Sequence, residues 1–218
     1  MQACDPILVA SPPRSGSSLT AGLIAHAGAW AGWTKVGDVH NRKGYYENVE
    51  LDRTLARYLS SCDEFRLGKR FQPKNLSEPL PDFRDVVFAN IEIEGYQGGP
   101  WVFKSTKTAI CRNLFLGDFP DSRWVLVKRD RKATIRSLMR TPFMDGYETE
   151  ADWDRFLETY DSYMSDIQDR AKHSHVFRAD LASQGDLHEV TMLLDFLELE
   201  ADPARLSQVW IAKELMNA

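Results

Sequence analysis

The amino-acid sequence predicts an α/β fold of three layers, in which a mainly parallel β-sheet is flanked by helices. Two observations support this prediction. Short apolar runs recur along the 218-residue chain, and segments with helical periodicity separate them. Strands that are apolar throughout are typical of a parallel sheet that is buried on both faces.

The apolar runs place four strands, at 7–10, 101–103, 124–127 and 175–178. The periodic segments place six helices, at 18–29, 49–60, 108–116, 132–140, 150–173 and 187–197. In the last of these helices the apolar residues fall on one face. A stretch rich in proline and charge, 69–84, is expected to form a surface excursion.

The composition predicts a single soluble domain, 1–218, with a small partner. The chain has 27 Lys and Arg against 32 Asp and Glu, a net charge of −5. Such a balance argues against a protein that wraps nucleic acid, although a local basic pocket remains compatible with it.

The cysteines indicate neither a metal site nor a disulfide framework. Cys4, Cys62 and Cys111 are widely spaced, with no CxxC pair, so they are expected to be reduced. The apolar segment 19–30 is too short to span a bilayer, and no signal-peptide pattern precedes it. We therefore expect a cytoplasmic protein without a membrane span.

Cations and hydroxyls gather where the predicted strands end. Segments 12–18, 104–107 and 129–137 each follow a strand and are rich in Lys, Arg, Ser and Thr. Ligands of parallel sheets bind at the carboxyl ends of the strands. An acidic protein that collects positive charge there is expected to bind an anion.

The stretch PRSGSS, which follows the first strand, has the composition of a phosphate cradle. Gly16 lets the backbone approach a ligand closely, Ser17 and Ser18 add hydroxyls, and Arg14 adds a forked cation. The alternative is an ordinary turn with a serine at the helix start. The Walker pattern GxxxxGK[ST] is absent, since no lysine follows Gly16.

A second piece of a phosphate site follows the third strand, in the sequence WVLVKRDRKATIRSLMR. Arg129 lies at the strand end and Ser137 about two turns into the next helix, so the two side chains can close on one phosphate. The alternative is an ordinary basic helix start. Basic residues oppose the macrodipole at a helix N-terminus, so their presence there favours a binding role.

These two motifs, in this order and strand context, resemble those of the sulfotransferases that use 3'-phosphoadenosine-5'-phosphosulfate (PAPS). PRSGSS resembles the family's 5'-phosphosulfate loop, and Arg129-x7-Ser137 its 3'-phosphate motif. HVFRADL at 175–181 and GYYEN at 44–48 are similar to elements of bacterial members. The resemblance implies a P-loop NTPase-like fold and a metal-independent transfer of a sulfuryl group from PAPS to a hydroxyl by in-line displacement. Adenosine 3',5'-bisphosphate would be released.

The resemblance also implies roles for particular residues. The 5'-phosphate is expected on Arg14 and the loop and helix start that follow it, namely Ser15, Gly16, Ser17, Ser18 and Leu19. The 3'-phosphate is expected on Arg129 and Ser137. Lys104 resembles the lysine beside the transferring group, and Arg14 is expected to assist it in catalysis. The family's animal members have Lys-Thr-His where this chain has Lys104-Ser105-Thr106, so the catalytic histidine is missing.

Another residue must therefore act as the general base. Glu47 is the first candidate, because other branches of the family use a glutamate and because flanking Tyr45 and Tyr46 would desolvate it and raise its pKa. His40 in the same segment is the rival. The plainer interpretation places Glu47 at a helix start, with Asn48 as the cap.

The acceptor is left open by the sequence, as a small molecule, lipid or carbohydrate hydroxyl. Tyr45, Tyr46, Phe143 and Met144 are candidates for its pocket, and the adenine ring has four aromatic candidates, Trp30, Trp33, Tyr147 and Trp210.

Two other functions stay open: a P-loop kinase or hydrolase that uses ATP and Mg²⁺, and a nucleotide-binding protein without sulfuryl transfer. Neither a nucleic-acid partner nor a metal is expected, and the oligomeric state is undetermined.

Overall fold

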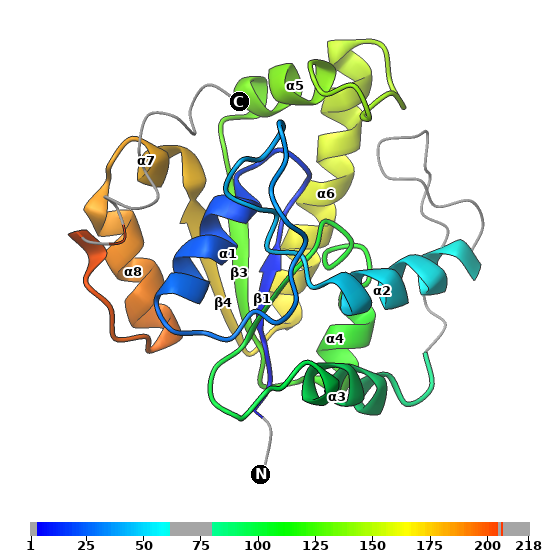
Figure 1. Cartoon of the computed structure of the whole chain (residues 1–218). Coiled ribbons are helices and arrows are strands. Elements are labelled where there is room, and N and C mark those ends of the chain that lie inside the picture. Colours follow the sequence, from blue (N-terminus) through cyan, green and yellow to red (C-terminus); the bar gives the residue numbers. More distant parts are fainter. Residues whose placement is uncertain (1–3, 62–79, 205, 207–218) are drawn as a thin grey trace.

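A four-stranded parallel sheet forms the centre of the protein. The structure is a computed structural model and describes residues 4–61, 80–204 and 206. The strands β1 (Ile7–Ala10), β2 (Val102–Lys104), β3 (Arg123–Lys128) and β4 (His173–Arg178) lie in the order β2-β1-β3-β4, and all neighbouring pairs are parallel. The predicted α/β class with a parallel sheet is confirmed (Figure 1).

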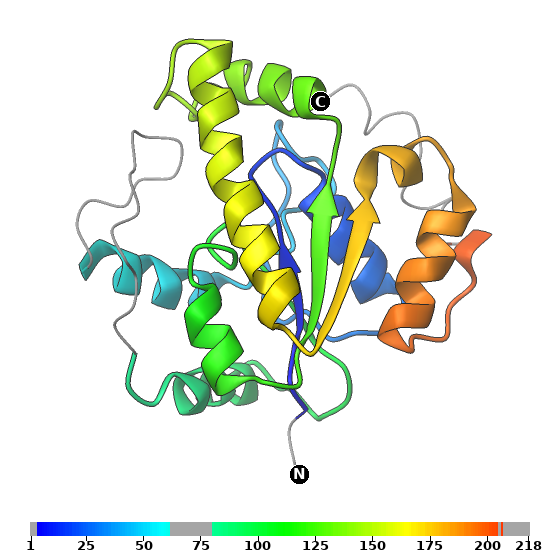
Figure 2. The same cartoon turned by 180° about the vertical axis from the view of Figure 1, so that it is seen from behind.

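Helices cover both faces of this sheet (Figures 1 and 2). Alternate residues of β1 divide between two hydrophobic clusters, Leu8 and Ala10 on one face and Ile7 and Val9 on the other. The first cluster includes residues of α2 (Val49–Ser61), α3 (Phe83–Ile93), α4 (Arg112–Asp118) and α6 (Glu150–Arg170). The second includes residues of α1 (Ser17–His26), α7 (Ala179–Ser183) and α8 (Leu187–Leu197).

The helix α5 (Arg131–Met139) lies across the carboxyl end of the sheet, above the point where β3 ends (Figure 1). Its apolar residues Ile135 and Leu138 pack with Trp153 and Leu157 of α6 in a third cluster. Because α5 packs on α6, its first turns are held next to the loops that follow the strands.

Most predicted elements are present, with shifted ends. The prediction missed α3, although its buried residues Phe83, Val87 and Ile91 recur at four-residue spacing, the signal of a helix face. The surface excursion expected at 69–84 therefore gives way to a helix at its end, and its first eleven positions lie outside the described residues. The short helix α7 was also missed.

Three predicted helix ends were wrong. The first helix was expected to run to position 29, and α1 ends at His26. The segment expected as a helix from position 108 forms turns, and α4 begins at Arg112. The long helix α6 ends at Arg170, because His173 already pairs with Arg123 as the first residue of β4. Since β4 lies at the edge of the sheet, it tolerates polar residues that do not read as a buried strand.

No helix within the described ranges is long and apolar enough to cross a lipid bilayer. Within the described residues, Cys4 and Cys111 are not joined in a disulfide, while Cys62 lies outside those residues.

Candidate active site

The three candidate segments meet at one end of the sheet. Because β1 lies between β2 and β3 in a parallel sheet, the residues that follow these strands emerge side by side. They are the loop 11–16 after β1, the turn that begins at Lys104, and Arg129. The convergence predicted from the sequence is present, at the edge where parallel sheets bind their ligands.

The loop after β1 is a tight turn into α1. Arg14 and Gly16 both adopt left-handed backbone angles, with φ of 64° and 96°, and the Ser15 hydroxyl donates to the Pro12 carbonyl at 2.7 Å. Ser15 is buried. Its hydroxyl is therefore used to close the turn, and only its amide can serve a ligand.

Gly16 is required at this turn for two reasons. Its φ is costly for residues with a Cβ, and a Cβ built there would lie 2.6 Å from the Cβ of Ala179, which follows β4. The next residue, Ser17, begins α1. The first turn of α1 has no acidic residue and no side-chain cap, so its amides are suited to an anion.

Arg14, Arg129 and Ser137 form one cluster. The Arg14 Nε donates to the Ser137 Oγ at 3.1 Å, and an Arg129 Nη donates to the Arg14 carbonyl at 3.1 Å. Arg14, whose backbone is left-handed, is thus held by Arg129, just after β3, and by Ser137 of α5. These two residues lie 115 and 123 positions further along the chain.

Positive charge is partly buried in this cluster. Burial lowers the pKa of Arg14 and Arg129, and the neighbouring charge of Arg14 lowers the pKa of Arg129 further. Among the ion pairs of the described residues, none involves either guanidinium. Two adjacent, half-buried cations without a paired carboxylate favour an anion between or beside them.

Two other charged residues near the start of α5 have structural partners. Asp130 caps the helix by accepting from the Ala133 amide at 2.7 Å. Arg131 pairs with Asp154 and Asp161 of α6. The basic residues at this helix start therefore have two explanations: Arg131 fastens α5 to α6, and Arg129 remains directed at the site.

Lys104 and Glu47 are ion-paired at the end of β2. The Lys104 Nζ donates to the Glu47 Oε1 at 2.8 Å, to the Tyr45 carbonyl at 3.3 Å and to the Ser18 Oγ at 3.4 Å. The side chains of Lys104 and Glu47 are 3% and 17% exposed. Lys104 and Glu47, two catalytic candidates from the sequence, are thus in direct contact. The Lys104 ammonium also contacts the first turn of α1 through Ser18.

The sequence predicted that the flanking tyrosines desolvate Glu47, whereas its contact in the structure is an ion pair with Lys104. Its carboxylate meets an ammonium, and the helix after it is capped by Asn48, whose Oδ1 accepts from the Leu51 amide at 3.0 Å. The helix-start interpretation and the catalytic one are therefore compatible, because the cap belongs to Asn48 and leaves Glu47 directed at Lys104.

Asp52 on α2 supports this pair, and sequence reasoning missed it. Its carboxylate accepts from the Ser105 hydroxyl at 2.6 Å and from the Lys107 Nζ at 2.8 Å. Asp52 therefore joins the helix that follows Glu47 to the turn that follows Lys104. Its position in the first turn of a predicted helix gave no signal, because an acidic residue is expected there in any case.

His40 lies in the same loop as Glu47 but faces another partner. Its ring packs edge-on against Phe143, with centroids 5.4 Å apart, and its amide donates to the Asp38 carboxylate at 2.8 Å. The structure therefore brings Glu47, and not His40, against Lys104.

The expected acceptor residues divide. The Tyr45 hydroxyl donates to the Asp38 carboxylate, at 2.8 and 2.9 Å, and burial together with this bond raises the pKa of Tyr45 to about 12. The Tyr46 hydroxyl faces His26 of α1 at 3.4 Å. Met144 was wrongly placed in a pocket, since it is buried in the cluster between α5 and α6.

Two of the four candidate aromatics for the adenine ring pack against other aromatic rings. Trp30 packs on Tyr96 and bridges to Trp101, just before β2 begins, at the opposite end of the strand. Tyr147 packs on Trp153 of α6 with centroids 4.9 Å apart. Trp33 is 62% exposed, and Trp210 lies outside the described residues.

Within the described part of the chain, no group of three or more His, Cys, Asp or Glu residues is arranged to hold a metal ion. The positive charge at the site comes from side chains and the α1 terminus.

Two solved structures that are similar to this chain are sulfotransferase domains. The sulfotransferase domain from the curacin biosynthetic pathway matches with a TM-score of 0.58 at 11% identity, over 94% of this chain and 77% of that one. The sulfotransferase domain from the Synechococcus PCC 7002 olefin synthase matches with a TM-score of 0.56 at 19% identity, over 99% and 84%. No protein-family model and no curated protein matches the sequence. The chain therefore has the fold of sulfotransferase domains.

Proposed function

We propose that the protein is a PAPS-dependent sulfotransferase that transfers a sulfuryl group to a hydroxyl acceptor. The fold is that of sulfotransferase domains, but a fold alone does not determine an activity. The observation that carries the proposal is the Arg14, Arg129 and Ser137 cluster beside the uncapped start of α1. We also propose that residues 1–218 act as one catalytic domain, in the cytoplasm.

The residues present fit a ligand with two phosphate groups. The amides from Ser15 to Leu19 and the Arg14 guanidinium would hold the 5'-phosphate, since a Cβ-free Gly16 lets the backbone close in. Arg129 and Ser137 would hold the 3'-phosphate. The Ser137 hydroxyl now accepts from Arg14, so its own hydrogen is available to a phosphate oxygen.

PAPS, when bound, supplies an activated sulfuryl group on its 5'-phosphate. The bond to be formed joins the acceptor oxygen to sulfur, and the bond to be broken joins sulfur to the 5'-phosphate oxygen. Lys104 would neutralise charge on that phosphate oxygen, assisted by Arg14. Glu47 would take the acceptor's hydroxyl proton; its contact with the Lys104 ammonium, at 2.8 Å, supports this role only by keeping the carboxylate next to the group that is transferred.

The alternatives have less support. A kinase or hydrolase of the P-loop class needs a lysine after the final loop glycine, and Ser17 stands there. A binding protein without transfer would have no need of the buried pair Lys104 and Glu47, since an isolated buried ion pair brings little stability.

Calorimetric titration with adenosine 3',5'-bisphosphate, beside ATP with Mg²⁺, tests the proposal. We expect the bisphosphate to bind without metal, and Arg129→Ala to weaken it roughly 10- to 100-fold, as the loss of a charge-assisted hydrogen bond implies. Lys128→Ala is the matched control. Lys128 is exposed, and its substitution removes one positive charge at the position next to Arg129. Preference for ATP with Mg²⁺, or equal losses in both variants, would overturn the proposal.

A further inference from the structure

Exposed apolar side chains gather at the end of the molecule where the site opens. Nine large apolar side chains of the described residues are exposed, and the two most exposed are Val36 at 81% and Val39 at 82%. Met139 and Phe143, at the end of α5 and just after it, are 44% and 49% exposed. Four of the nine thus lie in two short stretches, 36–39 in the loop before Glu47 and 139–143 at the end of α5.

The loop tip that carries the valines is tight, and residues 35–39 are all exposed. Asp38 and Asn41 exchange both backbone hydrogen bonds at 3.2 Å, and a Cβ at Gly37 would lie 2.5 Å from the Arg42 carbonyl oxygen. With its two arms this close, the tip has no interior in which Val36 or Val39 could be buried. Their exposure follows from the backbone.

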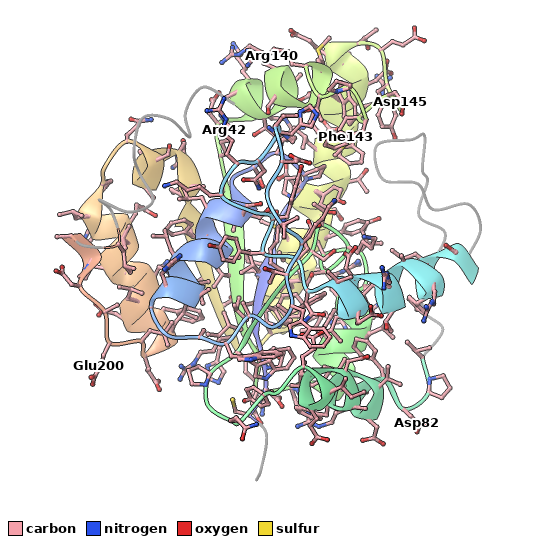
Figure 3. All side chains as sticks on the ribbon, viewed as in Figure 1. Arg42, Asp82, Arg140, Phe143, Asp145 and Glu200 are labelled. Atoms are coloured by element: carbon pink, nitrogen blue, oxygen red, sulfur yellow. The ribbon has the colours of Figure 1, made fainter. Side chains whose placement is uncertain are left out.

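The loop tip and the end of α5 form one surface. The His40 ring packs against Phe143, and Figure 3 shows Arg42, Phe143 and Arg140 at the same end of the molecule. We call this surface the basic apolar rim and define it by six exposed residues: Val36, Val39, Arg42, Arg136, Arg140 and Phe143.

The charge of these segments is opposite to that of the chain. Segments 31–48 and 128–145 together hold nine Lys and Arg against four Asp and Glu, whereas the whole chain holds 27 against 32. Arg129 belongs to the phosphate cluster and Arg131 is paired with α6. Six of the other seven cations are exposed, namely Lys35, Arg42, Lys128, Lys132, Arg136 and Arg140.

We propose that the basic apolar rim docks the protein on an anionic lipid surface. Cations around an exposed apolar tip match such a surface, because the tip enters the headgroup boundary while Lys and Arg attract anionic lipids. A small soluble anion would instead need a site that encloses it, and residues 35–39 are all exposed. Resting on the proposed function, the acceptor is then the hydroxyl of a membrane-borne amphiphile, presented beside Glu47.

Vesicle sedimentation tests the docking without an acceptor or a nucleotide. We expect the wild-type chain to sediment with vesicles of phosphatidylcholine and phosphatidylserine, to bind vesicles of phosphatidylcholine alone much less, and to be released by salt. The double variant Val36→Asp/Val39→Asp should bind at least about tenfold more weakly, since it removes apolar burial and adds like charge.

Ile93→Asp is the matched control, because Ile93 is 75% exposed on α3, at the opposite end of the molecule (Figure 1). It should retain binding. Absence of binding to phosphatidylserine vesicles, equal binding to both kinds of vesicle, or the same loss in Ile93→Asp would overturn the docking.

The same variants, titrated with adenosine 3',5'-bisphosphate, separate this inference from the proposed function. Binding of the bisphosphate without vesicle binding would reject the docking surface and leave the transferase proposal intact. Vesicle binding without bisphosphate binding would keep the docking surface and reject the acceptor assigned to it.

Discussion

The donor side and the acceptor side of the candidate site are built in different ways. On the donor side, Arg14 and Gly16 lie in one short backbone turn that leads into the uncapped start of α1. On the acceptor side, Lys104 meets Glu47 from a position 57 residues away, and Asp52 joins their two segments. A phosphate group, which many ligands share, can be held largely by the backbone of one segment. The proposed reaction next to it depends on side chains from separate elements.

The donor side should be the more sensitive to a single methyl group. Gly16→Ala forces a Cβ into a left-handed backbone, at about 1–2 kcal/mol, and into the Cβ of Ala179, at about 1–3 kcal/mol. We expect the free energy of unfolding to fall by about 2–4 kcal/mol and bisphosphate binding to be lost. Urea unfolding and calorimetric titration measure the two effects.

Gly28→Ala separates the two causes of this loss. Gly28 has φ of 109° but nothing within 4 Å of a built Cβ, so its substitution should cost only the backbone part. Ala179→Gly, added to Gly16→Ala, should recover the packing part. If Gly28→Ala is as damaging as Gly16→Ala, the contact with Ala179 does not matter and the packing argument is wrong.

On the acceptor side, the ion pair between Lys104 and Glu47 should contribute measurable coupling. Because both side chains are largely buried, removing one charge leaves the other without its partner. A double-mutant cycle with Lys104→Met and Glu47→Gln should give a coupling of about 1–3 kcal/mol in urea unfolding. Glu47→Gln should also retain bisphosphate binding while losing sulfuryl transfer.

An exposed pair provides the reference for this cycle. Lys172 and Asp121 lie 2.7 Å apart with side chains 60% and 66% exposed, and such pairs contribute about 0–1 kcal/mol. If the cycle of Lys172→Met and Asp121→Asn gives as much coupling as that of the buried pair, burial does not strengthen the contact between Lys104 and Glu47.

The difference between the two sides also explains what the sequence could predict. The strands could be predicted because they are apolar throughout, as buried parallel strands are. The sheet order then brings Arg14, Lys104 and Arg129 to one edge. The loop PRSGSS was readable because its glycine and its place between strand and helix are local properties. The helix α3 has a regular apolar spacing as well. Its first residues overlap the stretch rich in proline and charge, 69–84, whose composition predicts a surface excursion.

Side-chain pairing between distant segments carried no such signal. Nothing in the local sequence distinguishes Asp52, which holds Ser105 and Lys107, from an ordinary acidic residue of a first helical turn. Likewise, Met144 lies in an irregular segment but packs into a core that α5 and α6 form together. Such assignments depend on tertiary packing, which periodicity does not encode.

Asp52→Asn tests how firmly the two segments of the acceptor side are joined. The amide oxygen can still accept from the Ser105 hydroxyl, but the charge opposite Lys107 is lost. We expect a loss of about 1 kcal/mol in the free energy of unfolding, with bisphosphate affinity unchanged. Glu50→Gln, at an exposed ion pair on the same helix, should change it by less than about 0.5 kcal/mol; equal effects would contradict a joining role for Asp52.

The smallest expected effect concerns the loop that bears Glu47. Burial and the hydrogen bond to Asp38 raise the pKa of Tyr45 to about 12, from an ordinary value of about 10. The folded state thus holds this proton more tightly than the unfolded state, so the stabilisation is complete below pH 10 and is lost as the pH rises from 10 to 12. The tyrosinate absorbance of the wild type minus that of Tyr45→Phe should rise with a midpoint near 12, and Asp38→Asn should lower that midpoint. A wild-type midpoint near 10 would mean that Tyr45 lies free in water, and the acceptor side would then lack the anchor that holds its loop beside Arg14.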